Sequence, residues 1–403
     1  MNILVINTGS SSLKYQLFDM AGPTVLASGL VERIGESRAK LMHKKRPGQD
    51  GEGALTREEA MPDHGAAMRA VITLLTDPEH GVIKDTSEIN AVGHRVVHGG
   101  EHFHASTLVD ADVMDAIRAC VPLAPLHNPA NLIGLETAQA LFPGVPQVAV
   151  FDTAFHQTMP PKAYLYALPY ELYTELNVRR YGFHGTSHRF VAGEAARMLG
   201  KAPEDTNLIT VHLGNGSSIC AVKGGKSVDT SLGMTPLAGV IMGTRSGDID
   251  PAIIFYLAER KGYSLGEIDD ILNKKSGLKG ICGHNDMRDI HKAVAEGDAQ
   301  ARLALDMFGY RNRKYIGSYM AVLGRVDAIV FTAGIGENDP VSRELSCRGL
   351  TALGVELDHE RNQSPERGAR DIGAAGSQVR VMVIPTNEEL EIARQTGEVL
   401  RAR

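Results

Sequence analysis

The 403-residue sequence has no tryptophan, only four cysteines and no large excess of charge of either sign. Its cysteines (Cys120, Cys220, Cys282 and Cys347) are scattered and form no C-x-x-C pair. This spacing argues against a disulfide framework and a cysteine zinc site, and it favours a reducing compartment. The net charge of -6 argues against a nucleic-acid-binding protein, which normally carries a basic surplus.

Long hydrophobic runs are also absent. The opening segment, residues 1–9, is apolar for only a few residues before a turn signal, so it is typical of a buried strand rather than a signal peptide. No later run is long enough to span a membrane. We therefore expect a cytoplasmic protein that has no membrane partner.

The residues that are present indicate a globular enzyme of two domains. Hydrophobic residues make up 43% of the chain and charged residues 22%, which are ordinary values for such proteins. A chain of 403 residues is too long for one compact core. Many of its 43 glycines cluster near the ends of apolar runs, where the backbone approaches ligands closely.

Five short β-branched runs predict buried strands. Each run ends in a polar or glycine-rich segment: residues 3–6, 148–151, 208–211, 328–331 and 381–384. Continuously apolar strands are buried on both faces, so we expect helix-covered sheets and an α/β fold. Ligands of such sheets bind beyond the carboxyl ends of the strands.

A faint internal repeat suggests that the fold is duplicated. Residues 7–12 (NTGSSS) follow the first strand, and residues 215–218 (NGSS) follow a strand about half a chain later. A second β-prone segment follows each of them, which predicts a strand–turn–strand hairpin in both halves. With the chain length, this repeat favours two related domains that face each other across a cleft.

Three other segments complete the expected organisation. Residues 37–63 are polar and aperiodic, so we expect an irregular excursion from the first domain. Residues 66–75 and 388–401 have helical spacing and predict a structural helix and a closing C-terminal helix.

Three glycine-rich turns offer free backbone N–H groups to phosphate oxygens. They are Gly9–Ser12 with Lys14 nearby, His212–Gly216, and Gly334–Asn338. Any one of them is more often a plain hairpin or strand–helix turn, but three at the ends of separate buried strands favour phosphate binding. None has the G-x-x-x-x-G-K-[ST] order of a P-loop.

Oxygen-bearing side chains at strand ends could hold magnesium. Asn7 and Asp152 end strands, and Glu388 stands at a strand–helix junction. Magnesium keeps several waters, so one carboxylate and an amide suffice. Alternatively, Glu388 is an acidic residue of the first helical turn that only interacts favourably with the helix dipole, and Thr386 and Glu389 form a capping box.

Four cationic side chains stand in turns where anions bind. Arg95 and Arg245 are flanked by glycines, and the guanidinium group suits carboxylate or phosphoryl oxygens. Asp250 and Pro251 are expected to be the N-cap and first residue of a helix, which places Arg245 ahead of a helix N-terminus. His127 precedes Asn128-Pro129, and His184 precedes a helix that we expect to end near Leu199.

A histidine-rich segment could be drawn as a transition-metal cluster: His98, Glu101, His102 and His104. Its spacing matches neither a helix-face pair nor a zinc signature, so we do not expect metal there.

The sequence resembles the acetate kinase family along nearly the whole chain. Four motifs carry the resemblance: N-x-G-S-S-S-L-K at 7–14, R-Y-G-F-H-G-T-S-H at 180–188, D-T-S-L-G-M-T-P at 229–236 and G-I-G-E-N at 334–338. The resemblance implies a transferase that reversibly moves the γ-phosphoryl group of ATP to acetate, giving acetyl phosphate and ADP. We expect direct in-line transfer, because positioning and electrostatics dominate the catalysis of phosphoryl transfer. The resemblance also implies the duplicated, ribonuclease H-like fold of actin-like ATPases, with an interdomain cleft.

On this basis we expect an N-terminal domain of residues 1–152 plus 388–403. Residues 153–387 form the expected C-terminal domain, which binds nucleotide and carries dimerisation. The implied assembly is a homodimer, and the implied cofactor is Mg²⁺, with Mn²⁺ as a possible substitute.

The resemblance also implies roles for residues that match the family motifs. For acetate, Arg95 holds the carboxylate and four side chains enclose the methyl group: Val97, Leu126, Phe183 and Pro236. Catalytic roles fall to Asp152 as acid/base, to His184 and Arg245 as stabilisers of the transition state, and to His127 beside them. Asn7 and Glu388 are implied to bind magnesium. The implied nucleotide contacts are Lys14, His212, Leu213, Gly214, Asn215, Gly216, Asp286, Met287, Arg288, Gly334, Ile335, Gly336, Glu337 and Asn338.

Two points qualify these roles. Residues 280–288 lack the Ser/Thr-rich approach to D-x-R expected of the family and are one residue shorter, which leaves nucleotide preference open. Acetate is already ionised at neutral pH, so Asp152 has no proton to remove from it. We therefore expect Asp152 to orient hydrated magnesium or Arg95.

Two rival functions remain. A propionate or other short-chain carboxylate kinase differs only in the volume of its pocket, and a methylene in such a pocket is worth about 1–3 kcal/mol. Val97 is moderately bulky and favours the smaller acid. A non-catalytic ATP-driven clamp would need the phosphate loops but would have no use for Arg95, an apolar methyl pocket or His184.

Overall fold

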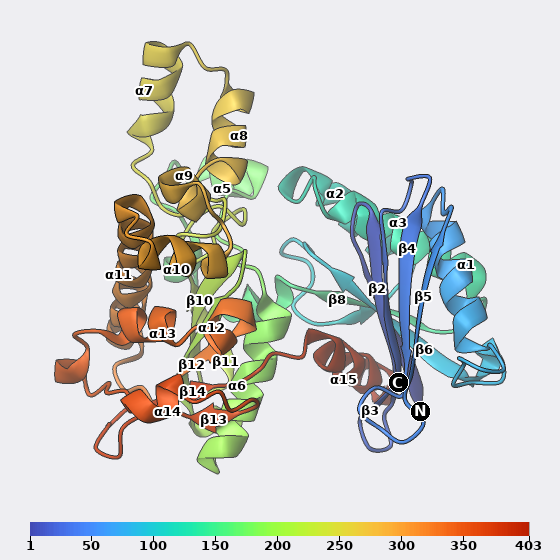
Figure 1. Cartoon of the computed structure of the whole chain (residues 1–403). Coiled ribbons are helices and arrows are strands. Elements are labelled where there is room, and N and C mark those ends of the chain that lie inside the picture. The colour runs from blue at the N-terminus through green and yellow to red at the C-terminus, as the bar shows by residue number, and fades with distance from the viewer. Residues whose placement is uncertain (403) are drawn as a thin grey trace. The chain divides into compact units, whose positions relative to one another are not determined.

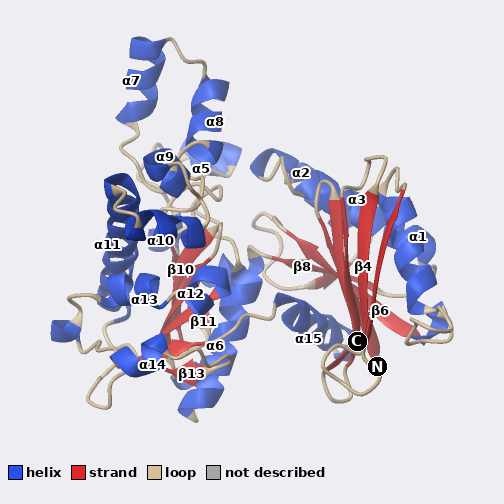
Figure 2. Ribbon diagram, viewed as in Figure 1, coloured by secondary structure: helices blue, strands red, loops and turns tan. Residues whose placement is uncertain are grey.

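The structure is a computed structural model that describes residues 1–402. The chain divides into two compact units. The first unit comprises Met1–Gln157 and Asn387–Arg403, and the second comprises Thr158–Thr386. Each unit contains one sheet with helices packed against it (Figures 1 and 2).

The first unit contains an eight-stranded mixed sheet of order β5-β4-β3-β2-β1-β6-β8-β7. Strands β1 to β3 are antiparallel, and β6 and β8 lie parallel to β1 and to each other. The strands are β1 Asn2–Thr8, β2 Ser12–Asp19, β3 Thr24–Glu32, β4 Ala39–Lys45, β5 Gly53–Glu59, β6 Ile89–Val96, β7 Thr107–Leu108 and β8 Gln147–Phe151.

The second unit contains a six-stranded mixed sheet of order β11-β10-β9-β12-β14-β13. Strands β9 to β11 are antiparallel, and β12 and β14 lie parallel to β9 and to each other. The strands are β9 Asn207–Leu213, β10 Ser217–Lys223, β11 Lys226–Thr230, β12 Ala328–Thr332, β13 Arg370–Asp371 and β14 Arg380–Val383.

The two sheets share a five-strand pattern. A three-stranded antiparallel meander in each unit is continued by two parallel strands, in the orders β3-β2-β1-β6-β8 and β11-β10-β9-β12-β14. The two NTGSSS-like segments form the matching turns, between β1 and β2 and between β9 and β10. The predicted duplication, both hairpins and all five buried strands are therefore confirmed.

Helices cover both faces of the first sheet because successive residues of β1 point to opposite sides. Leu4 and Ile6 pack in a cluster with α1, and Ile3 and Val5 pack in another with α15. The helices are α1 His64–Leu75, α2 Ala111–Ala119, α3 Asn128–Leu141 and α15 Glu388–Arg401. The bounds of α15 are those predicted for the C-terminal helix.

Helices also cover both faces of the second sheet. Ile209 and Val211 of β9 pack in one cluster with Phe308 of α11, and α6 contacts β9 and β12. The helices are α4 Pro161–Tyr164, α5 Glu171–Leu176, α6 Gly185–Leu199, α7 Ala252–Lys261, α8 Leu265–Lys274, α9 Gly277–Cys282, α10 Met287–Ala295, α11 Ala299–Leu323, α12 Ala333–Asn338, α13 Pro340–Cys347 and α14 His359–Gln363.

Three local predictions need correction. Residues 37–63 are not an irregular excursion, because β4 and β5 pair antiparallel and extend the sheet edge. The N-cap of α7 is Pro251 rather than Asp250, which instead accepts a hydrogen bond from the Ala252 N–H. The capping box of Thr386 and Glu389, considered as an alternative role for this turn, does not form: the N-cap is Asn387, whose side chain accepts from the Leu390 N–H.

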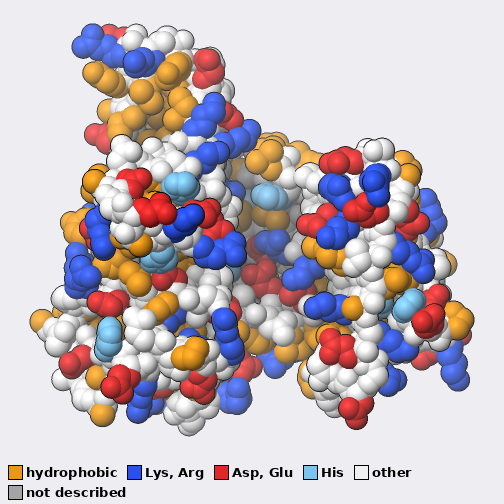
Figure 3. Space-filling view, viewed as in Figure 1, with side chains coloured by type: hydrophobic (Ala, Val, Ile, Leu, Met, Phe, Trp, Pro, Cys, Tyr) orange, Lys and Arg blue, Asp and Glu red, His pale blue; other side chains and the backbone are white. Residues whose placement is uncertain are grey.

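Apolar side chains lie exposed on the α7–α8 segment of the second unit (Figure 3). The largest are Ile253, Phe255, Tyr256 and Leu265. Among residues 1–402, no helix combines the length and the apolar character needed to cross a lipid bilayer.

Candidate functional site

In the first unit, two neighbouring parallel strands bring Arg95 and Asp152 together. Arg95 lies near the end of β6, and Asp152 follows β8, where its N–H donates to the Val96 carbonyl over 2.9 Å. The guanidinium donates to Asp152 Oδ2 from Nε (3.1 Å) and Nη2 (2.6 Å). The Asp152 side chain is 2% exposed and that of Arg95 is 24% exposed. The charge of Asp152 raises the pKa of Arg95, which therefore stays cationic.

The first turn of α15 adds two carboxylates to this cluster. Burial raises the pKa of Glu388 to about 7, against the opposing effect of the Arg95 charge. Asp152 and Glu389 also raise this pKa, so three carboxylates interact in one region. Glu389 forms an ion pair with Lys14 of β2. The sequence alone did not indicate this partner for Lys14.

Two buried asparagines of α3 hold the strand ends next to these groups. Asn131 Oδ1 accepts from the Val97 N–H, and its Nδ2 donates to the Thr8 carbonyl, both over 3.0 Å. One turn earlier, Asn128 bonds to both backbone groups of His98. The segments expected to bind carboxylate and metal are thus joined by one amide. A second asparagine three residues along a helix was the only sequence signal for this arrangement.

The start of α3 carries two further expected residues. His127 is the N-cap of α3 and is exposed, and Leu126 is 67% exposed. His127 therefore stands directly ahead of a helix, as predicted. In the first unit, Asn7 lies opposite Lys14 in the β1–β2 ladder.

In the second unit, histidines and hydroxyls gather behind the β9–β10 turn. The His184 and His212 rings lie 4.2 Å apart between centroids. The Ser218 hydroxyl lies 2.6 Å from His188 Nε2 and 3.3 Å from His184 Nδ1. His184 has φ 56°, a left-handed conformation that is uncommon for a residue with a side chain. His188 and Ser218, which the sequence did not single out, therefore support the expected catalytic histidine.

Arg245 adjoins the same turn. A Cβ atom on Gly216 would lie 3.3 Å from His184 Cε1 and 3.6 Å from Arg245 Nη1. The Gly243 N–H donates to the Asn215 carbonyl over 3.1 Å, which ties the Arg245 loop to the turn. Burial lowers the pKa of Arg245. A partly buried guanidinium beside a glycine turn is suited to bind an anion.

The segment that contains Pro236 is held by the R-Y-G-F-H motif. Phe183 is buried and Pro236 is partly exposed. The Tyr181 and Gly182 N–H groups donate to the Gly233 carbonyl. Arg180 Nη1 donates to three consecutive carbonyls, of residues 230, 231 and 232, over 2.9, 3.0 and 2.9 Å. Arg180 thus fixes the backbone that leads to Pro236.

The two remaining segments expected to bind nucleotide lie in α12 and at the start of α10. Gly334–Asn338 belongs to α12 and follows β12, which is the parallel neighbour of β9. Buried Arg343 donates to the Gly336 and Glu337 carbonyls over 2.9 and 3.0 Å. Asp286 is the N-cap of α10 and pairs with Arg288, whose side chain is 90% exposed.

Each unit therefore gathers its own part of the predicted site. In the first unit, Arg95, Asp152, Glu388 and Lys14 form one electrostatic cluster. In the second, the segments around His184, His212–Gly216 and Arg245 adjoin one another. His127 and Leu126 lie at the start of α3.

The donors at Glu388 and Asn7 fit magnesium. Among residues 1–402, no three His, Cys, Asp or Glu side chains are grouped so as to enclose a metal ion. Magnesium does not need such a group, since it usually keeps several waters and takes one or two carboxylates. Glu388 has neighbouring carboxylates and a raised pKa, so a divalent cation there would offset their repulsion.

Solved structures share this fold over nearly the full chain. An acetate kinase from Porphyromonas gingivalis matches with a TM-score of 0.94 and 45% identity, covering 99% of both chains. A propionate kinase from Francisella tularensis matches with a TM-score of 0.91, 45% identity and the same coverage. The duplicated sheets and these neighbours define the class, a two-unit α/β kinase.

The sequence comparison specifies the family. The profile of the Acetokinase family matches residues 2–394, and the chain belongs to that family. An acetate kinase of Oleidesulfovibrio alaskensis is 58% identical over 100% of both chains. An acetate kinase of Thermotoga maritima is 55% identical over 99% of both.

Proposed function

We propose that this protein is an acetate kinase, which reversibly transfers the γ-phosphoryl group of ATP to acetate to give acetyl phosphate and ADP. The observation that carries the proposal is the environment of Arg95. Its guanidinium is held by a buried carboxylate at a strand end, beside oxygen donors that suit magnesium. Family membership and full-length relatives named acetate kinase support the same activity.

Arg95 is proposed to bind the acetate carboxylate. Asp152 occupies one side of the guanidinium and leaves other N–H groups for the substrate, since arginine carries five donors. Asp152 is thus an orienting residue, because ionised acetate offers it no proton. The methyl group is assigned to Val97, Leu126, Phe183 and Pro236.

The nucleotide is assigned to the glycine-rich segments and to Lys14. In the second unit these are His212–Gly216, Asp286–Arg288 and Gly334–Asn338. The assignment is supported by the positions of two of these segments: His212–Gly216 lies at the end of β9, and Gly334–Asn338 follows its parallel neighbour β12. The ends of such strands are where α/β sheets bind ligands.

Asn7 and Glu388 are proposed to hold Mg²⁺, with Mn²⁺ as a substitute. When bound, the ion supplies positive charge for the phosphate oxygens. The chain's own cations contribute to the same end. Arg245, His184 and His127 are proposed to stabilise the charge that develops as an acetate oxygen attacks the γ-phosphorus. Such preorganised donors usually supply most of the catalysis of phosphoryl transfer.

Propionate kinase is the second candidate. It is supported by the Francisella tularensis structure, which is named a propionate kinase and matches at the same 45% identity as the Porphyromonas gingivalis acetate kinase. Val97, which is buried at 6% exposure, favours the smaller acid, because it narrows the space for an added methylene.

A coupled assay decides between these functions. Purified protein is given ATP, magnesium and acetate, propionate or butyrate, and ADP formation is followed. We expect acetate to have the highest kcat/KM, with propionate lower by roughly tenfold or more. A preference for propionate would support the second candidate. ATP turnover that needs no carboxylate would contradict both.

Two further properties are proposed with the function, namely a homodimer and a cytoplasmic location. The exposed apolar side chains of α7 and α8 support an association surface on the second unit. Light scattering after size-exclusion chromatography tests the dimer, because a mass near one chain would contradict it.

A further inference from the structure

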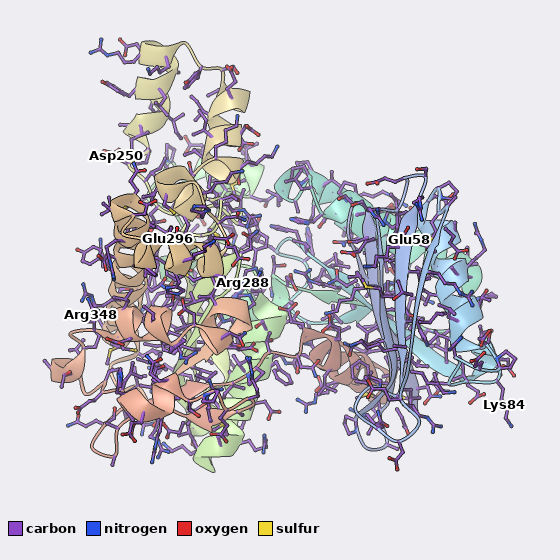
Figure 4. All side chains as sticks on the ribbon, in the orientation of Figure 1. Glu58, Lys84, Asp250, Arg288, Glu296 and Arg348 are labelled. Atoms are coloured by element: carbon purple, nitrogen blue, oxygen red, sulfur yellow. The ribbon has the colours of Figure 1, made fainter. Side chains whose placement is uncertain are left out.

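His291 and Asp339 join two separate segments of the proposed nucleotide site. His291 lies on α10, three residues after Arg288. Asp339 directly follows Asn338 and is the N-cap of α13. His291 Nε2 lies 2.9 Å from Asp339 Oδ2. Figure 4 labels Arg288 and Glu296, which mark the two ends of α10.

The Asp339 carboxylate is held in one orientation. Its Oδ1 accepts from the Val341 N–H over 3.1 Å, and its Oδ2 accepts from the Ser342 hydroxyl over 2.5 Å as well as facing His291. The side chain of Asp339 is 10% exposed and that of His291 is 32% exposed. The pair is therefore sheltered enough for its charge to contribute.

Arg343 holds α12 through separate contacts. This buried guanidinium binds the Gly336 and Glu337 carbonyls and both the side chain and the carbonyl of Asn362. All of these partners lie in α12 and α14, and none lies in α10. The His291–Asp339 pair is thus a direct side-chain link between the helix that carries Arg288 and the residue that follows the Gly334–Asn338 segment.

The electrostatics give this link a pH dependence. The hydrogen bond that His291 donates to Asp339 raises the pKa of His291 above its ordinary value. Burial works to raise the pKa of Asp339, but hydrogen bonds from His291 and Ser342 outweigh it and the pKa is lowered. The other charges that face the pair are Arg302 of α11, which lowers the pKa of His291, and Arg343, which interacts with Asp339.

We propose that His291 is a positioning residue for nucleotide binding, which acts through Asp339 to hold α10 and the Gly334–Asn338 segment at the spacing that ATP requires. The inference rests on the proposed function, since it assumes that both segments contact ATP. It makes the affinity for nucleotide depend on pH and leaves the affinity for acetate unaffected.

The sign follows from the raised pKa. The extra strength of the charged pair is fully present below about pH 6.5, the ordinary pKa of histidine. It is lost as the pH rises through the raised value, where the ring becomes neutral. A neutral histidine still donates one hydrogen bond, as glutamine does. His291→Gln therefore imitates the neutral ring at every pH.

The test compares the native chain, His291→Gln and Asp339→Asn between pH 6 and 9. It measures the dissociation constant of magnesium–ATP by calorimetry, and the KM of ATP, the KM of acetate and kcat by the coupled assay. Asp339→Asn keeps an oxygen to cap α13 and removes the charge. The matched control is His359→Gln, at an exposed histidine of α14.

We expect His291→Gln to weaken ATP binding roughly three- to tenfold at pH 6, and by less than about twofold at pH 9, with acetate KM unchanged. Asp339→Asn should behave alike, and His359→Gln should match the native chain. A loss that is independent of pH, or equal for acetate, overturns the proposal. If the affinity for ATP shows this pH-dependent difference between the native chain and His291→Gln, but the native chain shows no acetate-dependent turnover, only the proposed function fails.

Discussion

At the scale of single residues, Arg245 has the most direct task in the proposed reaction. Its guanidinium is partly buried beside Gly216 and His184, where it can stabilise charge on the transferred phosphoryl group. We expect Arg245→Ala to lower kcat by about a hundredfold or more, with smaller changes in the KM of ATP and acetate.

Steady-state kinetics of the coupled reaction measure this effect. The matched control is Arg260→Ala, an exposed arginine of α7, which should leave kcat within about twofold. Near-normal turnover of Arg245→Ala would remove this residue from the mechanism.

A substitution of Asp152 tests the orienting role proposed for this residue. Asp152 is buried and orients Arg95 by accepting its hydrogen bonds. Asp152→Asn should therefore raise the KM of acetate by roughly ten- to a hundredfold, which corresponds to the loss of a charged hydrogen bond. The KM of ATP should change little. Asp115→Asn, in an exposed ion pair with Arg118, is the control.

The informative comparison for Asp152→Asn is between affinity and turnover. If turnover falls while both KM values stay native, and excess magnesium does not restore it, then Asp152 takes part in the chemistry itself and the orienting role is wrong.

At the scale of secondary-structure elements, Asn131 couples α3 to two strand ends. Asn131→Ala leaves the buried Val97 N–H and Thr8 carbonyl without their partner. We expect the free energy of unfolding to fall by about 2–4 kcal/mol, because both orphaned groups lie in a water-poor region. Urea unfolding of the native chain and the variant measures the difference.

The control for this element is Asn285→Ala. Asn285 is exposed in the loop before α10, and its loss should change stability by less than about 0.5 kcal/mol. Equal effects of the two variants would show that Asn131 does not join α3 to β1 and β6.

The same scale shows where sequence patterns sufficed. Runs of four apolar residues were enough to locate β1, β8, β9, β12 and β14, because a strand buried on both faces needs no partner to be recognised. Residues 37–63 were misjudged as irregular because β5 is an edge strand, whose residues are mostly exposed, and edge strands carry little hydrophobic signal.

At the scale of the whole molecule, the last helix belongs to the unit that begins the chain. Ile392 and Ala393 of α15 pack with Ile3, Val5 and Val150 of the first sheet. A Cβ atom on Gly93 would lie 2.4 Å from Thr396 Oγ1, which shows how closely α15 lies against β6. The first unit is therefore incomplete until the C-terminus has been made.

Truncation tests this dependence. Removal of residues 388–403 exposes one face of the first sheet and deletes Glu388, so we expect loss of cooperative unfolding in the first unit and no acetate-dependent turnover. Thermal unfolding and the coupled assay measure both effects. A control chain that ends at Arg401 should remain native. A truncated protein with native unfolding behaviour would contradict the assignment of α15.

The sequence by itself determined the five buried strands, the two hairpin turns and the chemical types of the proposed site residues. Strand runs, the repeated Asn–Gly–Ser turn, and Arg95, Arg245 and Glu388 could all be recognised from local patterns, since such patterns depend on neighbours in the chain. Only the tertiary structure decided which side chains meet. The Arg95–Asp152 pair, the Asn131 bridge and the His291–Asp339 link join residues 57, 123 and 48 positions apart. Their energies come from burial and from distances of about 3 Å, which folding of the whole unit creates and no local pattern encodes.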